Sequence, residues 1–167
     1  YADRLAHEMD VGRQYQIIPF RGEYYELVPE KRDLVQSMIY PTPDPELPFL
    51  GVHYTRMTDD KVTIGPNAVL AFGREAYQNT QFDISELRET LGYKGFWKLF
   101  SSLKMINVGL NELNKSYRKK AFITAAQKLL PAVGPDDFRK SYSGIRAQIV
   151  RDDGTLIKDP LFEHGSR

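Results

Sequence analysis

The sequence has no cysteine, and this absence removes several kinds of chemistry together. Disulfide bonds, zinc sites built on thiolates and a cysteine nucleophile are all excluded. The three histidines, His7, His53 and His164, show no H-E-x-x-H or similar spacing, so the sequence predicts no metal site. Gly-x-Gly-x-x-Gly, Walker A and Gly-x-Ser-x-Gly motifs do not occur in the 167 residues either. These residues alone therefore show no self-sufficient catalytic apparatus.

An excess of charge and long apolar runs are absent as well. The 23 lysines and arginines against 22 aspartates and glutamates leave a net charge of +1, too small to argue for nucleic acid or an acidic membrane surface. No apolar run approaches the roughly 18 residues that a membrane-spanning helix needs. These observations predict no nucleic-acid partner and a cytoplasmic location.

What the sequence does contain is typical of a folded domain. With 167 residues, of which 41% are hydrophobic and 12% aromatic, the chain can bury one real core. Apolar residues from Tyr1 to Met9 have helical spacing, so we expect a helix that begins at or before the first residue. The last residues directly follow an apolar segment. We therefore expect both ends to continue into a longer protein.

Strand patterns dominate residues 14–67 and centre on residues 49–67. In the latter stretch, β-branched residues on both sides of a polar turn at residues 58–61 predict a hairpin. Residues 41–48 precede it with four prolines, which exclude helix and central strand and indicate a stiff extended connector. A hairpin needs partner strands to be stable in water, and the chain supplies candidates on both sides.

The strands expected before the connector form a second hairpin. Residues 14–20 and 21–27 are predicted to be successive strand segments, with Pro19 at an edge or bulge between them. Residues 34–40 follow a turn and are predicted to pair with the preceding strand. Gly22 is expected to permit a close approach of another part of the backbone.

Residues 83–142 differ from the rest and are predicted to be mostly helical, with Ser85 as the first helix cap. Residues 68–82 have little periodicity and are expected to be a loop. Strand patterns return at residues 143–163, where Asp-Gly marks a last hairpin with its turn at residues 151–155. The order of strands, helices and strands predicts an α+β fold, a mainly antiparallel or mixed sheet of hairpins with an inserted helical block.

Two groups of polar strand residues are candidates for chemistry, and each has a structural alternative. Arg146 lies among small and apolar residues, which suits two parallel hydrogen bonds to a carboxylate; a solvated strand face or a structural ion pair is the alternative. Alternation places Arg21, Glu23 and Tyr25 on one strand face and Tyr24 on the other. These residues line a pocket or form a salt-bridged ladder.

The central hairpin carries the remaining candidates. His53 lies on its first arm, where it can act as a general base or a hydrogen-bond donor, or can have a structural role. Arg56 lies on the same arm. Asn67 ends the second arm in Gly-Pro-Asn, which is a turn by composition.

Three segments together resemble a known family. They are Ile-Pro-Phe-Arg-Gly-Glu-Tyr-Tyr at residues 18–25, the stretch from residue 40 to residue 67 that ends in Ile-Gly-Pro-Asn, and Gly-Ile-Arg-Ala-Gln at residues 144–148. This combination is similar to the D-amino-acid-oxidase-like FAD-dependent oxidoreductases, and within that family to the enzymes that oxidise L-2-hydroxyglutarate. The resemblance covers nearly the whole chain and is weakest in the helical block.

The resemblance implies that residues 1–167 are a substrate-binding domain whose FAD-binding segments lie beyond both ends. It implies oxidation of L-2-hydroxyglutarate to 2-oxoglutarate by hydride transfer to FAD. The implied partners are a small dicarboxylate substrate and the rest of the FAD domain, with peripheral membrane association where a membrane quinone accepts the electrons. The 167 residues by themselves are expected to be inactive.

The resemblance also implies roles for particular residues. Arg146 matches a carboxylate-binding arginine, and His53 is the better candidate for the catalytic base. The resemblance further implies that the substrate contacts Arg21, Tyr25 and Arg56. It implies that the cofactor contacts Tyr24 and Asn67. Two alternatives stay open: a related flavoenzyme acting on another 2-hydroxy acid, an amino acid or glycerol 3-phosphate, and a binding module without catalytic activity.

Overall fold

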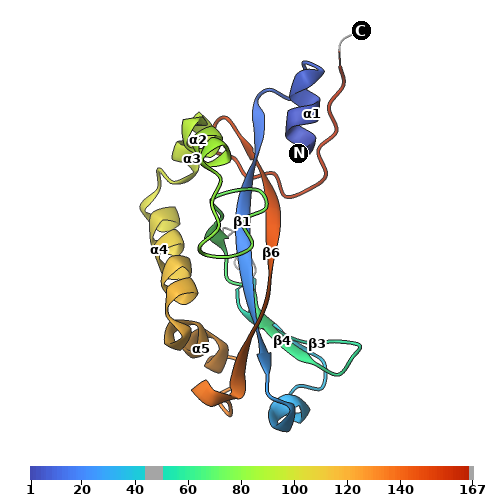
Figure 1. Cartoon of the computed structure of the whole chain (residues 1–167), viewed down its shortest axis with the longest axis vertical. Helices are drawn as coiled ribbons and strands as arrows, with labels where there is room; N and C mark the ends of the chain where they lie inside the picture. Colours follow the sequence, from blue (N-terminus) through green and yellow to red (C-terminus); the bar gives the residue numbers. More distant parts are fainter. Residues whose placement is uncertain (44–50, 166–167) are drawn as a thin grey trace. The chain divides into compact units, whose positions relative to one another are not determined.

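The computed structural model describes residues 1–43 and 51–165. A block of strands is followed by a block of helices and a last strand, an α+β arrangement (Figure 1) that confirms the predicted class. Among the described residues, no helix has the length and apolar character to cross a membrane. In chain order the elements are α1 (Ala2–Glu8), β1 (Tyr15–Leu27), the 3₁₀ helix η1 (Pro29–Leu34), β2 (Met38–Ile39), β3 (His53–Arg56), β4 (Val62–Gly65), β5 (Val69–Leu70), α2 (Ile84–Gly92), α3 (Lys94–Leu99), α4 (Leu103–Tyr117), α5 (Lys119–Gln127), the 3₁₀ helix η2 (Pro135–Asp137) and β6 (Phe138–Arg151).

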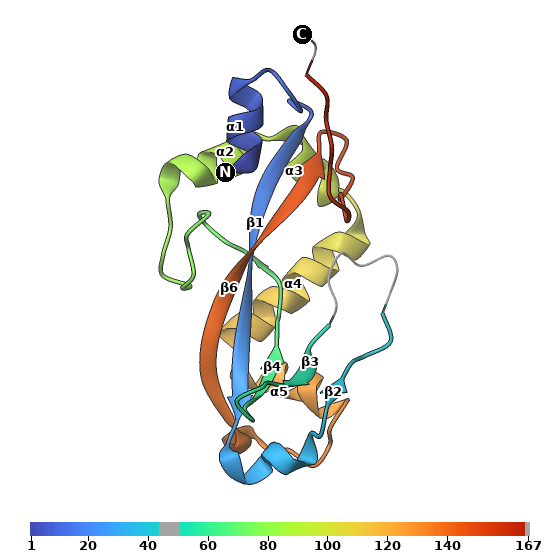
Figure 2. The ribbon, with the colours of Figure 1, turned by 90° about the vertical axis from the view of Figure 1, so that its right-hand side faces the viewer.

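The described strands form one six-stranded sheet in the order β2-β3-β4-β1-β5, and β6 also pairs with β1. The predicted central hairpin is confirmed, because β3 and β4 pair antiparallel with His53 opposite Gly65 and Arg56 opposite Val62. Figure 2 shows β2 alongside this hairpin. The first two residues predicted for the hairpin, and most of the proline-rich connector, lie outside the described residues.

The predicted second hairpin is wrong. β1 is a single strand of 13 residues that continues through Pro19, whose carbonyl still accepts a hydrogen bond from the Ala71 backbone N–H at 3.0 Å. β2 pairs with β3 instead of β1, with Met38 opposite Thr55. The reason is competition for the edge of β1, where β4 already pairs with Tyr25 and its neighbour. A proline in the first turn of η1 also favours a helical turn over a tight hairpin.

Four further features differ from the prediction. The expected loop at residues 68–82 contains the short strand β5, and β6 begins at Phe138, inside the predicted helical block. Asp83 caps α2 in place of Ser85, because its side chain accepts a hydrogen bond from the Glu86 backbone N–H at 2.9 Å. The last turn forms as predicted, but its second arm contributes only an isolated bridge between Val150 and Leu156.

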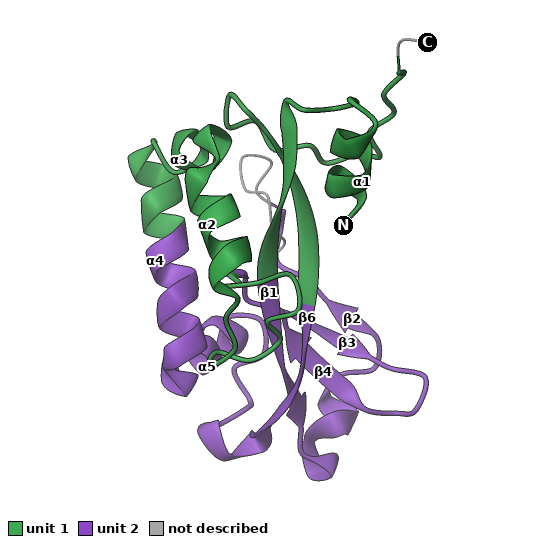
Figure 3. Ribbon diagram, turned by 45° about the horizontal axis from the view of Figure 1, so that its top comes forward, with its two compact units in different colours: residues 1–20, 70–108, 145–167 green, residues 21–69, 109–144 purple. Residues whose placement is uncertain are grey.

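The chain divides into two compact units, coloured separately in Figure 3. Unit 1 comprises Tyr1–Phe20, Leu70–Val108 and Ile145–Arg167, and unit 2 comprises Arg21–Val69 and Gly109–Gly144. The long elements β1, α4 and β6 each contribute residues to both units.

Unit 2 contains the main hydrophobic core. The largest buried side chain is Tyr54 of β3, whose hydroxyl donates to the Ala126 carbonyl of α5 at 3.1 Å. Burying each aliphatic side chain of this core contributes about 1.5–3 kcal/mol, so the hairpin is held mainly by its apolar face. The buried members of the core are Leu27, Val35, Val52, Tyr54, Val62, Ile64, Phe122, Ile123, Ala126, Val133 and Phe138.

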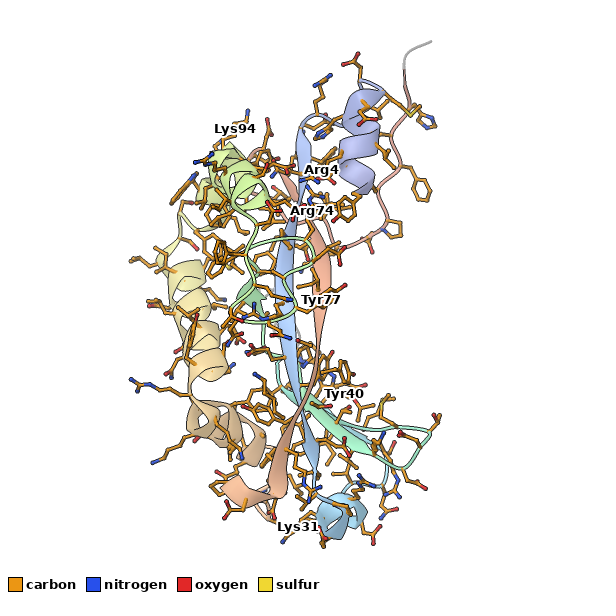
Figure 4. All side chains as sticks on the ribbon, in the orientation of Figure 1. Arg4, Lys31, Tyr40, Arg74, Tyr77 and Lys94 are labelled. Carbon is orange, nitrogen blue, oxygen red and sulfur yellow. The ribbon has the colours of Figure 1, made fainter. Side chains whose placement is uncertain are left out.

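Unit 1 is held together by a buried ion-pair network. The carboxylate of Asp3, on α1, accepts hydrogen bonds from Nη1 and Nη2 of Arg74 at 2.6 and 2.8 Å. One of its oxygens also accepts a hydrogen bond from the Ile17 backbone N–H at 2.9 Å. Glu89 of α2 binds both Arg74 and Arg4 at 3.0 and 2.5 Å (arginines labelled in Figure 4). The network therefore joins α1, the start of β1 and α2.

Candidate functional site

A buried polar cluster forms where β1 meets the turn after β4, within unit 2. Arg21 and Glu23 alternate along β1, and Arg21 Nε lies 3.4 Å from Glu23 Oε1. Asn67 completes the cluster: its Nδ2 donates to Glu23 Oε2 at 2.8 Å, and its Oδ1 accepts the Glu23 backbone N–H at 2.7 Å. The three residues are only 3%, 7% and 2% exposed. Glu23 is thus the common partner that holds the cluster together.

Two glycines allow the turn to approach β1 closely enough to form this cluster. A Cβ atom on Gly22 would lie 2.7 Å from Cβ of Pro66, so only glycine fits, and the close approach predicted for Gly22 is confirmed. Gly65 has a φ of +143°, and a Cβ there would lie 2.7 Å from the Glu23 carbonyl oxygen. The Gly65-Pro66 turn therefore packs directly on β1 and brings Asn67 to Glu23.

Glu112 of α4 supports the same turn, although nothing in the sequence pattern singles it out. Its Oε2 accepts the backbone N–H of Ala68 at 2.9 Å, and Lys115 Nζ contacts its Oε1 at 2.5 Å. The residue lies 44 positions from Ala68, so only the folded chain brings them together. Asn67 is therefore held in two ways. Glu23 binds its side chain, and Glu112 binds the backbone of the next residue, Ala68.

His53 is the first residue of β3 and lies opposite Gly65, at the end of the hairpin that leads to Asn67. Its Nδ1 lies 3.0 Å from the Gly51 carbonyl, and its ring packs on Tyr40 with centroids 4.8 Å apart. Because a carbonyl can only accept, Nδ1 carries the proton and the lone pair of the neutral ring is on Nε2. Nε2 makes no hydrogen bond to the residues that the structure describes, so it is the nitrogen able to accept a proton.

Tyr24 and Tyr25 have different surroundings, as alternation along β1 predicts. Tyr24 stacks on Tyr142 with centroids 4.6 Å apart and planes 20° apart, and burial, together with Tyr142, raises the pKa of its phenol. Tyr25 packs on Phe122 and Phe138 of the core, with centroids 4.6 and 6.4 Å away. Burial, and then the charge of Glu23, raise the pKa of Tyr25, so both phenols stay protonated at neutral pH.

Arg56 lies at the other end of β3, about 10 Å along the strand from His53. Its Nη2 contacts Asp60 at 3.1 Å and its Nη1 donates to the Val35 carbonyl at 3.1 Å. These contacts fix the β3–β4 turn against the end of η1. They favour a structural role for Arg56, and the predicted contact with substrate stays a prediction.

Arg146 belongs to unit 1, on β6, where its side chain is exposed. Two residues further along the strand, Gln148 is buried and donates to the Ile157 carbonyl at 2.9 Å. Arg146 and Gln148 are alternate residues of β6, and the first is exposed whereas the second is buried. The other predicted site residues all belong to unit 2.

Two cavities lie within unit 1, and none of the predicted site residues lines either. The larger, of about 260 Å³, lies between α1, the start of β1 and the C-terminal segment, with a mostly apolar lining that includes Ala6, Val11 and Leu161. The other, of about 220 Å³, is bordered by Glu75, Asp83 and Glu86. Its acidic border does not suit a dicarboxylate.

Comparison with known proteins identifies the family. Residues 1–166 match the family model described as FAD dependent oxidoreductase. The chain belongs to this family. It is 46% identical over 160 residues to the L-2-hydroxyglutarate dehydrogenase of Indibacter alkaliphilus, covering 95% of this chain and 40% of that protein.

Other relatives carry the same name. The L-2-hydroxyglutarate dehydrogenase of Escherichia coli K12 is 44% identical over 161 residues, covering 96% of this chain and 38% of the relative. The mitochondrial L-2-hydroxyglutarate dehydrogenase of Mus musculus is 39% identical over 166 residues, covering 99% of this chain and 35% of the relative. The chain therefore spans 40% or less of the length of these curated relatives.

The described residues do not fit the nucleotide part of FAD. A pyrophosphate is held by a glycine-rich turn that leads from a strand into a helix N-terminus, and residues 1–43 and 51–165 contain no such turn. The first α-helix after a strand, α2, begins with the acidic cap Asp83. Both polar atoms of the Asn67 side chain are engaged by Glu23. Contacts of Tyr24 and Asn67 with the cofactor therefore stay predictions.

Proposed function

We propose that this chain is the substrate-binding part of an FAD-dependent enzyme that oxidises L-2-hydroxyglutarate to 2-oxoglutarate. The observation that carries the proposal is identity of 39–46% over nearly the whole chain to proteins with that name. Membership of the FAD-dependent oxidoreductases supports the class of reaction. FAD, when bound, supplies the acceptor for the hydride from C2 of the substrate.

In this proposal the substrate carboxylates are bound by arginines. Arg146 is exposed on β6, and a guanidinium can give a carboxylate two parallel hydrogen bonds. Arg21 is proposed separately as a substrate contact, because it belongs to unit 2 and Arg146 to unit 1. The contact of Arg21 Nε with Glu23 fixes the direction of the guanidinium. The buried Glu23–Asn67 pair thus acts as the support for Arg21.

His53 is the proposed base for the hydroxyl proton of the substrate. Its Nε2 is the accepting nitrogen, since Nδ1 faces the Gly51 carbonyl. A base positioned in this way contributes roughly 10²- to 10⁴-fold to a rate.

A substrate panel tests the proposal on the full-length protein that carries this chain. The rate of turnover is measured with a dye as electron acceptor. The substrates are L-2-hydroxyglutarate, a 2-hydroxy monocarboxylate, an L-amino acid and glycerol 3-phosphate. We expect 2-oxoglutarate to form from the first and negligible turnover of the others. Preference for glycerol 3-phosphate or an amino acid would contradict the proposed substrate and leave the family assignment intact.

The location of the protein also stays a prediction. The Mus musculus relative is named mitochondrial, whereas the bacterial names give no compartment. A cytoplasmic location is proposed for a bacterial source only. Peripheral membrane association through a quinone acceptor belongs to the same proposal. Fractionation of cells that express the full-length protein tests it, and enrichment in an organelle would contradict it.

A further inference from the structure

Tyr24 and His53 lie on the same face of the sheet in unit 2. On β1, Tyr25 pairs with Ile64 of β4, and Ile64 pairs in turn with Tyr54 of β3. These three side chains belong to the core face, where the Tyr54 hydroxyl reaches α5. Successive residues of a strand point to opposite faces, so the neighbours Tyr24 and His53 belong to the face away from the core.

Gly65 lies between Tyr24 and His53 on this face. It pairs with His53 across the β3–β4 hairpin, and a Cβ atom on it would lie 3.0 Å from Cδ1 of Tyr24. Because Gly65 has no side chain, the Tyr24 ring can approach β4. His53 and Tyr24 are on strands two apart, so their backbones are separated by about 10 Å. One small molecule can therefore contact both side chains.

Tyr142 of β6 adds a second phenol to the same face, because its ring stacks on Tyr24. The Tyr142 side chain is 54% exposed. Within residues 1–43 and 51–165, nothing forms a hydrogen bond with the hydroxyl of either tyrosine. A phenol hydroxyl can donate to a carboxylate. The stack thus presents two uncommitted donors on the face that carries His53.

We propose that Tyr24 and Tyr142, the tyrosine pair, bind the substrate carboxylate that is farther from the reacting carbon. The inference rests on the proposed function, in which the substrate is a dicarboxylate and His53 accepts the proton of its hydroxyl. With that hydroxyl at His53 Nε2, the substrate chain extends over Gly65 to the tyrosine pair. Hydrogen bonds to an ionised acceptor are roughly twice as strong as those between neutral groups, which favours a carboxylate as the ligand.

Two other roles for the tyrosine pair lead to different expectations. A structural stack between β1 and β6 needs the two rings and neither hydroxyl. Phenylalanine keeps the ring and removes only the donor, so replacement by phenylalanine separates binding from stacking. A contact with the cofactor, which the family resemblance implies for Tyr24, would change the amount of FAD that the protein holds.

Calorimetric titration of the full-length protein with glutarate and with butyrate tests the proposal. Glutarate has a carboxylate at each end, whereas butyrate has one, and neither carries the hydroxyl that is oxidised. We expect Tyr24→Phe, and separately Tyr142→Phe, to weaken glutarate binding about tenfold, because each loses a hydrogen bond to a charged group. Butyrate binding should not change, since butyrate has no second carboxylate.

Tyr117→Phe is the matched control, because Tyr117 is 63% exposed on α4 and belongs to the same unit. It should bind glutarate like the parent protein. Unchanged glutarate affinity in the double variant Tyr24→Phe, Tyr142→Phe would overturn the proposal, and a loss of FAD with that result would indicate a cofactor contact instead. The titration needs no turnover, so failure of the parent protein to oxidise L-2-hydroxyglutarate would contradict the proposed function alone.

Discussion

The substitution Asp3→Asn should loosen the attachment of α1 within unit 1. Burial by itself raises the pKa of the Asp3 carboxyl, but the hydrogen bonds from Arg74 and from the Ile17 backbone outweigh it and lower the pKa from 3.8 to about 2. Lowering a pKa by one corresponds to about 1.36 kcal/mol, so the charged carboxylate stabilises the folded state by about 2 kcal/mol. Asp3→Asn removes this contribution and leaves Glu89 as the carboxylate that still pairs with the buried Arg74 guanidinium.

Hydrogen exchange of the Ile17 amide in the full-length protein is the direct assay, because that N–H donates to Asp3. A loss of about 2 kcal/mol corresponds to exchange about 30-fold faster. Asp10→Asn is the control: Asp10 pairs with Arg13 on the surface, where an ion pair contributes little, and Asn tolerates the positive φ of Asp10.

The stabilisation by the Asp3 carboxylate should depend on pH in a defined direction. Because the pKa of Asp3 is lowered by folding, its stabilisation is present above about pH 4 and is lost as the pH falls towards 2. The difference between parent protein and Asp3→Asn should therefore shrink over that interval. Equal exchange rates in Asp3→Asn and Asp10→Asn at neutral pH would refute the claim that the network holds α1.

Three further predictions concern the candidate site, each made on the full-length protein. Gly22→Ala places a Cβ 2.7 Å from Cβ of Pro66, so it should lower the free energy of unfolding by about 1–3 kcal/mol, measured by thermal denaturation. Gly144→Ala, whose Cβ would meet nothing within 4 Å, should leave that free energy unchanged. His53→Gln should lower kcat roughly 10²- to 10⁴-fold; a loss below tenfold would exclude His53 as the base. Arg146→Lys keeps the charge but not the paired hydrogen bonds, so KM for L-2-hydroxyglutarate should rise about tenfold; an unchanged KM would contradict its role.

Local patterns in the sequence predicted the structures that depend on neighbouring residues. The β3–β4 hairpin is specified by its own polar turn and β-branched arms, so it could be predicted without the rest of the chain. The partner of β2 could not, because that choice depends on β4 occupying the edge of β1. Pairing between distant strands is decided by competition that no local pattern records.

The candidate site shows the same limit. Gly22 was predicted to permit a close approach, and the structure shows that Pro66 is what approaches. The bonds between Glu23 and Asn67 join residues 44 positions apart, and no spacing in the sequence points to them.

The most direct test of the proposed function is anaerobic mixing of the full-length protein with L-2-hydroxyglutarate while the flavin absorbance near roughly 450 nm is followed. The proposal predicts rapid bleaching by the L acid and none by glycerol 3-phosphate or amino acids. A bound flavin that stays oxidised with L-2-hydroxyglutarate would contradict the proposed substrate, and a protein without bound flavin would contradict the proposed reaction.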